Sequence, residues 1–262
     1  GPQRATLYVD SSGEALFKRG WREDKGDAPL KETLAAAMLA AAGWHGTAQA
    51  GGALHDPCCG SGTIAIEAAQ IACGIAPGLQ RRFAFERLLP FATPEHRALL
   101  QRLKSQARSR VHAPVVPISA SDVSFRMLDF ARRNAERAGV AHAIEFHGGD
   151  ALERAAPVLP PDLPGTLMLN PPYGARIGVA GKAARPSAED RATPDDFFAR
   201  LAAHWKRAYT QHPAGWTAWV LSPDMKLPGA MRLKASLRVP LWNGPIECRL
   251  FRFELVAGSA RD

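Results

Sequence analysis

The sequence predicts an α/β fold, in which strands of a sheet are joined by crossover helices. Short β-like apolar runs alternate along the chain with helical stretches, and this alternation is typical of that class. A glycine-rich turn, with Gly60 and Gly62, stands between one such strand and the helix after it. The 262 residues fit one domain of this class, with at most a small extension.

The elements can be placed from turn and cap residues. We expect a hairpin of residues 5–10 and 14–19 around a turn at Gly13, then a helix at 30–44 that starts after Pro29. Further strands are expected at residues 53–56, 115–120, 143–147, 166–170, 216–222, 231–239 and 247–256. Further helices are expected at residues 62–73, 125–138 and 195–211, with a partly helical segment at 79–111 and a loop at 174–194.

Composition excludes several classes of protein. Hydrophobic residues make up 46% and charged residues 22%, which excludes a disordered or collagen-like chain. No apolar stretch reaches the roughly 18 residues that a membrane span needs. The four cysteines lack CxxC spacing, so we expect no metal site, and their use indicates a reducing compartment, hence the cytoplasm.

The net charge of +8 comes from an excess of arginine. Such an excess favours a polyanionic partner, although a GC-rich genome produces the same bias, so charge alone leaves the question open. Residues 79–111 carry eight basic side chains against two acidic ones. The chain starts Gly1-Pro2 without an initiator Met, which is typical of a protease-cleavage remnant and suggests a piece of a longer protein.

The first motif is the run LHDPCCGSGT at residues 54–63. Its glycines permit a tight turn and a close approach to a ligand, and the N-terminus of the following helix offers N–H groups to a carboxylate or phosphate. Asp56 closes the strand, and an acid there suits a ligand with an ammonium group. S-Adenosylmethionine has both groups, whereas a nicotinamide site wants its acid about 20 residues beyond the glycines. An ordinary glycine turn is the alternative.

Two more strands end in acids. Asp122 could accept both hydroxyls of a ribose, or could cap the next helix. Asp150 could accept from an adenine amino group, or could be a turn residue after two glycines.

The most specific motif is Asn170-Pro171-Pro172-Tyr173, which follows a strand. The prolines stiffen the backbone and remove two donors, so the Asn170 side-chain oxygen and the Pro171 carbonyl form a rigid pair of acceptors. This pair suits an exocyclic NH₂ group on a planar base, with Tyr173 stacked on the ring. A proline-rich loop without such a role is the alternative.

These motifs together resemble the catalytic domain of bacterial THUMP-associated 23S ribosomal RNA guanine-N2 methyltransferases. The resemblance extends to residues 10–22, 28–32, 75–79 and 243–250, hence to nearly the whole chain. It implies a class I (Rossmann-like) methyltransferase fold: a seven-stranded, mostly parallel sheet with one antiparallel strand near the end and helices on both faces. We expect residues 1–50 to be an extension packed on a catalytic domain at 51–262.

The resemblance also implies roles for individual residues. The catalytic set would be Asn170, Pro171, Pro172 and Tyr173. The S-adenosylmethionine site would comprise Lys31, Asp56, Cys58, Gly60, Gly62, Thr63, Asp122, Val123, Asp150, Ala151 and Asn170. Candidates for RNA contact are Lys18, Arg19, Arg22, Arg81, Arg82 and Arg176. Family members usually carry an N-terminal THUMP RNA-binding module, which these residues do not include, and often a second acid where Ser124 stands.

We therefore expect methyl transfer to the N2 amino group of a guanine in 23S ribosomal RNA. A transfer-RNA guanine-N2 enzyme shares the same motifs. An adenine-N6 DNA enzyme or a protein glutamine enzyme is a weaker alternative, because the chain lacks a target-recognition region and has Gly174 after the acceptor loop. A catalytically silent RNA-assembly module and a nicotinamide dehydrogenase fit less well.

Overall fold

A computed structural model describes residues 3–26, 29–171 and 194–257. Its strands are β1 (Ala53–Asp56), β2 (Ile118–Asp122), β3 (Glu145–Gly148), β4 (Gly165–Leu169), β5 (Trp216–Ser222), β6 (Leu237–Asn243) and β7 (Ile246–Leu255). They form one seven-stranded sheet in the order β3-β2-β1-β4-β5-β7-β6. Strands β1 to β5 are parallel, and β7 is antiparallel to both β5 and β6. This confirms the expected fold class, including the single antiparallel strand near the end.

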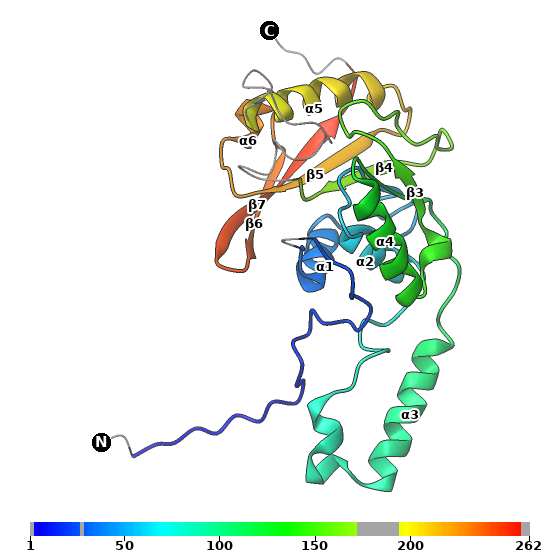
Figure 1. Cartoon of the computed structure of the whole chain (residues 1–262), viewed down its shortest axis with the longest axis vertical. Coiled ribbons are helices and arrows are strands. Elements are labelled where there is room, and N and C mark those ends of the chain that lie inside the picture. The colour runs from blue at the N-terminus through cyan, green and yellow to red at the C-terminus, as the bar shows by residue number, and fades with distance from the viewer. Residues whose placement is uncertain (1–2, 27–28, 172–193, 258–262) are drawn as a thin grey trace.

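Helices cover both faces of the sheet (Figure 1). They are α1 (Glu32–Ala41), α2 (Thr63–Ala72), α3 (Pro94–Arg108), α4 (Phe125–Arg137), α5 (Pro194–Ala208) and α6 (Leu227–Ala230), with short 3₁₀ turns at Ala84–Arg87, Leu89–Phe91 and Ala141–Ala143. Alternate side chains of β4 point into different cores: Met168 packs with α1, α2 and α4, whereas Leu167 and Leu169 pack with α5 and α6. Both faces of the central strands are therefore buried, as parallel sheets require.

The order of the strands places a topological switch next to β1. The chain moves outward from β1 to β2 and β3, then returns to β4 on the other side of β1. Ligands of open α/β sheets bind outside the carboxyl ends of the strands at such a point. The edge that carries the ends of β1 and β4 is therefore the place to look for a site.

The prediction of a hairpin at residues 5–19 is wrong. Its turn exists, because the N–H groups of Ser12 and Gly13 donate to Asp10 Oδ1 at 2.9 and 3.0 Å, and Gly13 has φ +76°. The flanking residues form no strand, however, and Leu7 and Tyr8 are more than 90% exposed. An isolated ribbon with no apolar face to bury is marginal at best.

Other differences concern the ends of elements. The helix expected at 30–44 is shorter, at Glu32–Ala41. The strand expected at 231–239 begins only at Leu237, because Leu227–Ala230 forms α6 and buries Leu227 beneath α5. Within the described residues, no helix is long and apolar enough to cross a membrane.

Gly62 is required where α2 approaches α4. It has φ +87°, and a Cβ built on it would lie 3.0 Å from Ala131 Cβ. We expect Gly62→Ala to lower the free energy of unfolding by about 2–4 kcal/mol, which combines left-handed strain with overpacking. Gly139→Ala is the control, because Gly139 has φ +75° but open space around it, so only the strain of about 1–2 kcal/mol is expected. Urea unfolding measures both, and equal losses would contradict the packing argument.

Candidate active site at the carboxyl edge of the sheet

Three acids lie together at one edge of the sheet. Asp56 is the last residue of β1, Asp122 is the last residue of β2, and Asp150 comes two residues after β3. The three strands are adjacent and parallel, so these ends meet, and Asp122 is paired with Gly148 in the sheet. The structure thus brings together the acids that the sequence places at successive strand ends.

The glycine turn after β1 is tied to the end of β2. The N–H of Gly60 donates to Asp122 Oδ2 at 2.9 Å, and the N–H of Cys59 donates to the carbonyl of Ser121 at 2.9 Å. The other carboxylate oxygen of Asp122 accepts from the N–H of Ser124 at 2.9 Å. Each oxygen keeps a free lone pair, so the carboxylate can still accept from a ligand.

Ser124, where a second acid is often found, has a structural role. Its hydroxyl accepts from the N–H of Met127 and so caps α4. Asp122 is therefore not the N-cap of this helix, and its carboxylate faces the glycine turn instead.

Asp56 is the most unusual group in the site. It is 1% exposed; its Oδ1 accepts from the N–H of Cys58 at 3.2 Å, but its Oδ2 has no partner among the described residues. Burial raises the pKa of Asp56, and the nearby carboxylate of Asp122 raises it further. Buried polar atoms are normally satisfied, so an unpaired buried carboxylate oxygen points to a cationic ligand.

Asn170 lies on the other side of the switch. It directly follows β4, the neighbour of β1, and is half-buried beside the buried Pro171. Asp150, beyond β3, accepts from the N–H of Leu152 at 2.9 Å, which is the turn geometry that the sequence left open. Pro172, Tyr173 and Arg176 lie outside the described residues.

Arg22 and Asn134 hold the glycine turn in place. The sequence suggested Arg22 for RNA contact and did not suggest Asn134 for the site. Arg22 donates to Ser61 Oγ at 3.2 Å and to Thr63 Oγ1 at 2.7 Å, and forms an ion pair with Glu32 at 2.8 Å. Asn134 of α4 is fully buried and donates to the carbonyl of Ser61 at 3.0 Å. A buried asparagine on the apolar face of an amphipathic helix was the available signal.

Three of the candidate RNA contacts are used inside the protein. Arg19 binds both carboxylate oxygens of the buried Glu67 at 3.1 and 3.2 Å. Arg81 is 7% exposed and donates to the carbonyls of Ser12, Glu14 and Ala15. With Arg22, these guanidinium groups already have partners, so they are not free for phosphates.

The remaining basic candidates lie at the surface. Lys18 is exposed and forms an ion pair with Glu14 at 2.5 Å, and Arg82 is exposed. Lys31, expected at the cofactor, is also exposed, and its ammonium lies 5.1 Å from the centre of the Phe17 ring. Its contact in the structure is thus with this ring rather than with the three acids.

Cys58 and Cys59 are packing residues of the turn. Burial raises the pKa of both thiols, and the carboxylates of Asp56 and Asp122 raise it further. A thiol held protonated is a poor nucleophile. The raised pKa values therefore disfavour a nucleophilic role for either cysteine.

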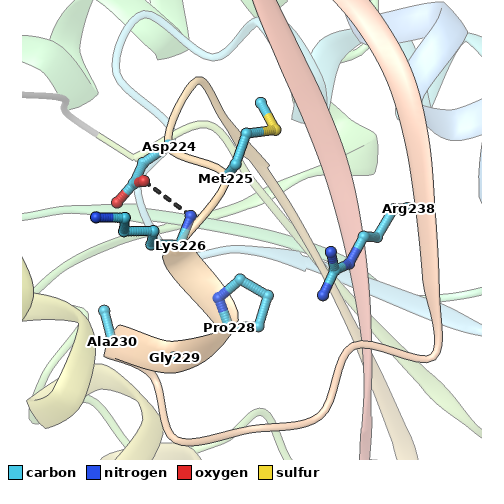
Figure 2. Close-up of a pocket in the computed structure, with 7 residues that line it drawn as sticks. All are labelled: Asp224, Met225, Lys226, Pro228, Gly229, Ala230 and Arg238. Carbon is cyan, nitrogen blue, oxygen red and sulfur yellow. Dashed lines mark hydrogen bonds between the residues drawn. The ribbon is translucent and has the colours of Figure 1, made fainter.

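A hollow, which we name the Asp224 hollow, opens at the same edge, after β5. Its volume is about 660 Å³, and Figure 2 shows Lys226 and Arg238 on opposite sides of it. Asp224 shapes its rim, because its Oδ1 accepts from the N–H of Lys226 at 2.8 Å. Since β5 is parallel and adjacent to β4, this hollow follows the strand end next to Asn170.

A Rossmann-like sheet with one antiparallel strand, strand-end acids and a glycine turn after β1 defines the class I methyltransferases. The chain belongs to the family described as RMKL-like, methyltransferase domain, whose model matches residues 19–252. It is 39% identical over 257 residues to the ribosomal RNA large subunit methyltransferase K/L of Shewanella loihica. That match covers 98% of this chain but spans only about a third, 33%, of the relative's length.

Solved structures agree with this assignment. The crystal structure of SMU.472, described as a methyltransferase complexed with SAH, has a TM-score of 0.75 and 28% identity, and the match covers 96% of this chain and 58% of that one. A methylase from Listeria monocytogenes, described as N6-adenine-specific for DNA, has a TM-score of 0.73 and 28% identity, covering 93% and 56%.

Proposed function

We propose that this domain uses S-adenosylmethionine to methylate the exocyclic N2 amino group of a guanine in 23S ribosomal RNA. The observation that carries the proposal is the buried, unpaired Oδ2 of Asp56 at the switch point, with the Asn170 loop on the adjacent strand end. The name of the Shewanella relative supports ribosomal RNA as the substrate class.

The residues of the site fit this cofactor. Asp56 would accept the ammonium group of the methionine part, and the N–H groups at the start of α2 suit its carboxylate. Asp122 would accept the ribose hydroxyls and Asp150 the adenine amino group. A Cβ built on Gly60 would meet nothing within 4 Å, so the turn leaves room for a ligand. Cys58, Gly62, Thr63, Val123 and Ala151 are the proposed lining.

The acceptor loop holds the nucleophile. The Asn170 side-chain oxygen and the Pro171 carbonyl would each accept one N–H of the guanine amino group, so the nitrogen lone pair turns out of ring conjugation. S-Adenosylmethionine, when bound, supplies an electrophilic methyl group. Positioning rather than a strong base then does most of the chemistry. Pro172 and Tyr173 complete this proposed loop, and the base must leave any stack to reach it.

Contacts to the rest of the RNA are proposed for Lys18, Arg82 and Arg176, together with Lys226 and Arg238 around the Asp224 hollow. Association with a THUMP module and a cytoplasmic location also stay predictions. So does the division into an extension at 1–50 and a domain at 51–262, although Arg22 ties the first part to the turn of the second.

One experiment separates the candidate functions. The purified domain is incubated with S-adenosylmethionine and, separately, ribosomal RNA, transfer RNA and DNA, and the nucleosides are analysed by mass spectrometry. N2-Methylguanosine in ribosomal RNA is expected. The same product in transfer RNA alone would make transfer RNA the substrate instead. N6-Methyladenine in DNA would favour the activity named for the Listeria neighbour. Binding of S-adenosylhomocysteine with no product on any substrate would contradict the proposed activity.

Asp56→Asn should strongly weaken cofactor binding while stabilising the unliganded protein. Loss of the Asp56 carboxylate leaves the ammonium group of the ligand without a partner, which costs about 2–5 kcal/mol of binding free energy. Because its pKa is raised in the folded state, the native protein holds this proton more tightly than the unfolded chain, so stability falls as the pH rises above the ordinary range of an aspartate.

Calorimetry with S-adenosylhomocysteine and thermal unfolding from pH 4 to 8 measure both effects. Asp224→Asn, at the neighbouring hollow, is the matched control and should bind normally. If Asp56→Asn binds like the wild type, or is less stable than it at pH 8, this role for Asp56 is wrong.

A further inference from the structure

One segment projects away from the sheet. Helix α2 starts at the carboxyl end of β1 and runs back, so its last residue, Ala72, lies at the opposite edge, where β2 begins. Residues 79–111, which we name the arm, lie in the connection between these two points. The two chain segments that flank the arm are joined at its base, because the N–H of His112 donates to the carbonyl of Cys73 at 3.0 Å. Figure 1 shows α3 and the segment before it projecting away from the sheet and from the helices that cover it.

The arm is held together by its own aromatic residues. Phe85 stacks on Phe83 and meets Phe91 edge-on, with ring centres 5.6 and 5.9 Å apart, and Phe91 meets His96 at 5.7 Å. Thr93 caps α3 by accepting from the N–H of His96 at 3.3 Å. None of the α3 side chains is buried, so the helix contributes little to the main core.

Most of the positive charges of the arm are exposed and unpaired. Six of its arginines are exposed and have no carboxylate partner among the described residues: Arg82, Arg87, Arg97, Arg102, Arg108 and Arg110. The arm's one described ion pair joins Lys104 to Glu86 at 3.7 Å. The partly buried Arg19, Arg22 and Arg137 of the body bind carboxylates instead. Unpaired like charges on a small body repel one another, and a polyanion removes that cost.

We propose that the arm is a surface that binds the phosphates of RNA at a distance from the reacting base. The choice of RNA as the ligand rests on the proposed function. Guanidinium groups pair well with phosphates, and the stretch from Arg97 to Arg108 is about 16 Å long by helical rise. The arm leaves the sheet at the edge opposite Asn170. It therefore strengthens binding of long RNA without taking part in methyl transfer.

The test compares two sets of neutral substitutions. Arg102→Gln, Arg108→Gln and Arg110→Gln are combined in one variant. Arg200→Gln, Lys206→Gln and Arg207→Gln on α5 form the control, because these residues are also exposed and carry the same total charge. Binding of a long 23S ribosomal RNA fragment is measured from 50 to 300 mM salt, and binding of S-adenosylhomocysteine and the melting temperature are measured for every variant.

The arm variant should bind the RNA about ten- to a hundredfold more weakly at 0.1 M salt, and the slope of log K against log salt should fall in magnitude by about two. The control should change much less. Methyl transfer at saturating RNA should be unchanged. Equal losses in both variants, or no loss in the arm variant, would overturn the proposal, whether or not the wild type methylates RNA. Because binding is measured without turnover, a wild type that binds through its arm but gives no methylated product would instead contradict the proposed function.

Discussion

Replacing Asn170 by alanine should lower methyl transfer to RNA by about a hundred- to a thousandfold while leaving the affinity for S-adenosylhomocysteine nearly unchanged. The side-chain oxygen of Asn170 is the acceptor that would orient the guanine amino group, and loss of one fixed polar group at a reacting centre typically has an effect of this size. Binding of the cofactor depends on Asp56, Asp122 and the glycine turn, which the substitution does not touch.

Single-turnover rates at saturating RNA, with calorimetry on the same preparation, measure the two effects separately. Asp224→Asn again provides a control at the same edge of the sheet, since Asp224 lines the Asp224 hollow and lies outside the acceptor loop. Activity of Asn170→Ala within tenfold of wild type would remove Asn170 from the catalytic set. A matching loss of cofactor affinity would instead give it a structural role.

The strand-end acids were predictable because their positions follow from two local facts. A strand is recognisable from its apolar run, and parallel strands end at one edge, so Asp56 and Asp122 had to meet there. Which hydrogen bonds they make could not be predicted. The bond from Gly60 to Asp122 joins residues 62 positions apart and depends on how the turn packs.

The partners of Arg19, Arg22 and Arg81 could not be predicted, because a sequence shows a charge but not the group that binds it. Arg19 meets Glu67 across 48 positions, and Arg81 meets backbone carbonyls 66 to 69 positions away. Six arginines of the arm, which the sequence showed only as part of a basic segment, are exposed and have no carboxylate partner among the described residues. The hairpin failed for a related reason: its turn is local and was correct, but pairing needs a surface to pack against, and residues 5–10 have none.

Arg22→Met should lower the free energy of unfolding by about 3–5 kcal/mol. The substitution leaves Glu32 without its cation, and the two side chains are only 12% and 3% exposed. Removal of one partner of a buried ion pair strands the other charge, which is the costly case. The combined variant Arg22→Met, Glu32→Leu should recover at least half of the loss. Denaturant unfolding of both variants and of Glu32→Leu measures the coupling.

Arg133→Met is the matched control, because Arg133 also forms ion pairs, with Asp24 and Asp129, but is 45% exposed, so its loss should cost no more than about 1 kcal/mol. Arg22→Met should also weaken binding of S-adenosylhomocysteine, since Arg22 holds the hydroxyls of Ser61 and Thr63 at the turn. An RNA-contact role predicts the reverse: normal stability, normal cofactor binding and weaker RNA binding. That result would restore Arg22 to the RNA surface, and it would mean that the turn is held by Asn134 without help from the N-terminal segment.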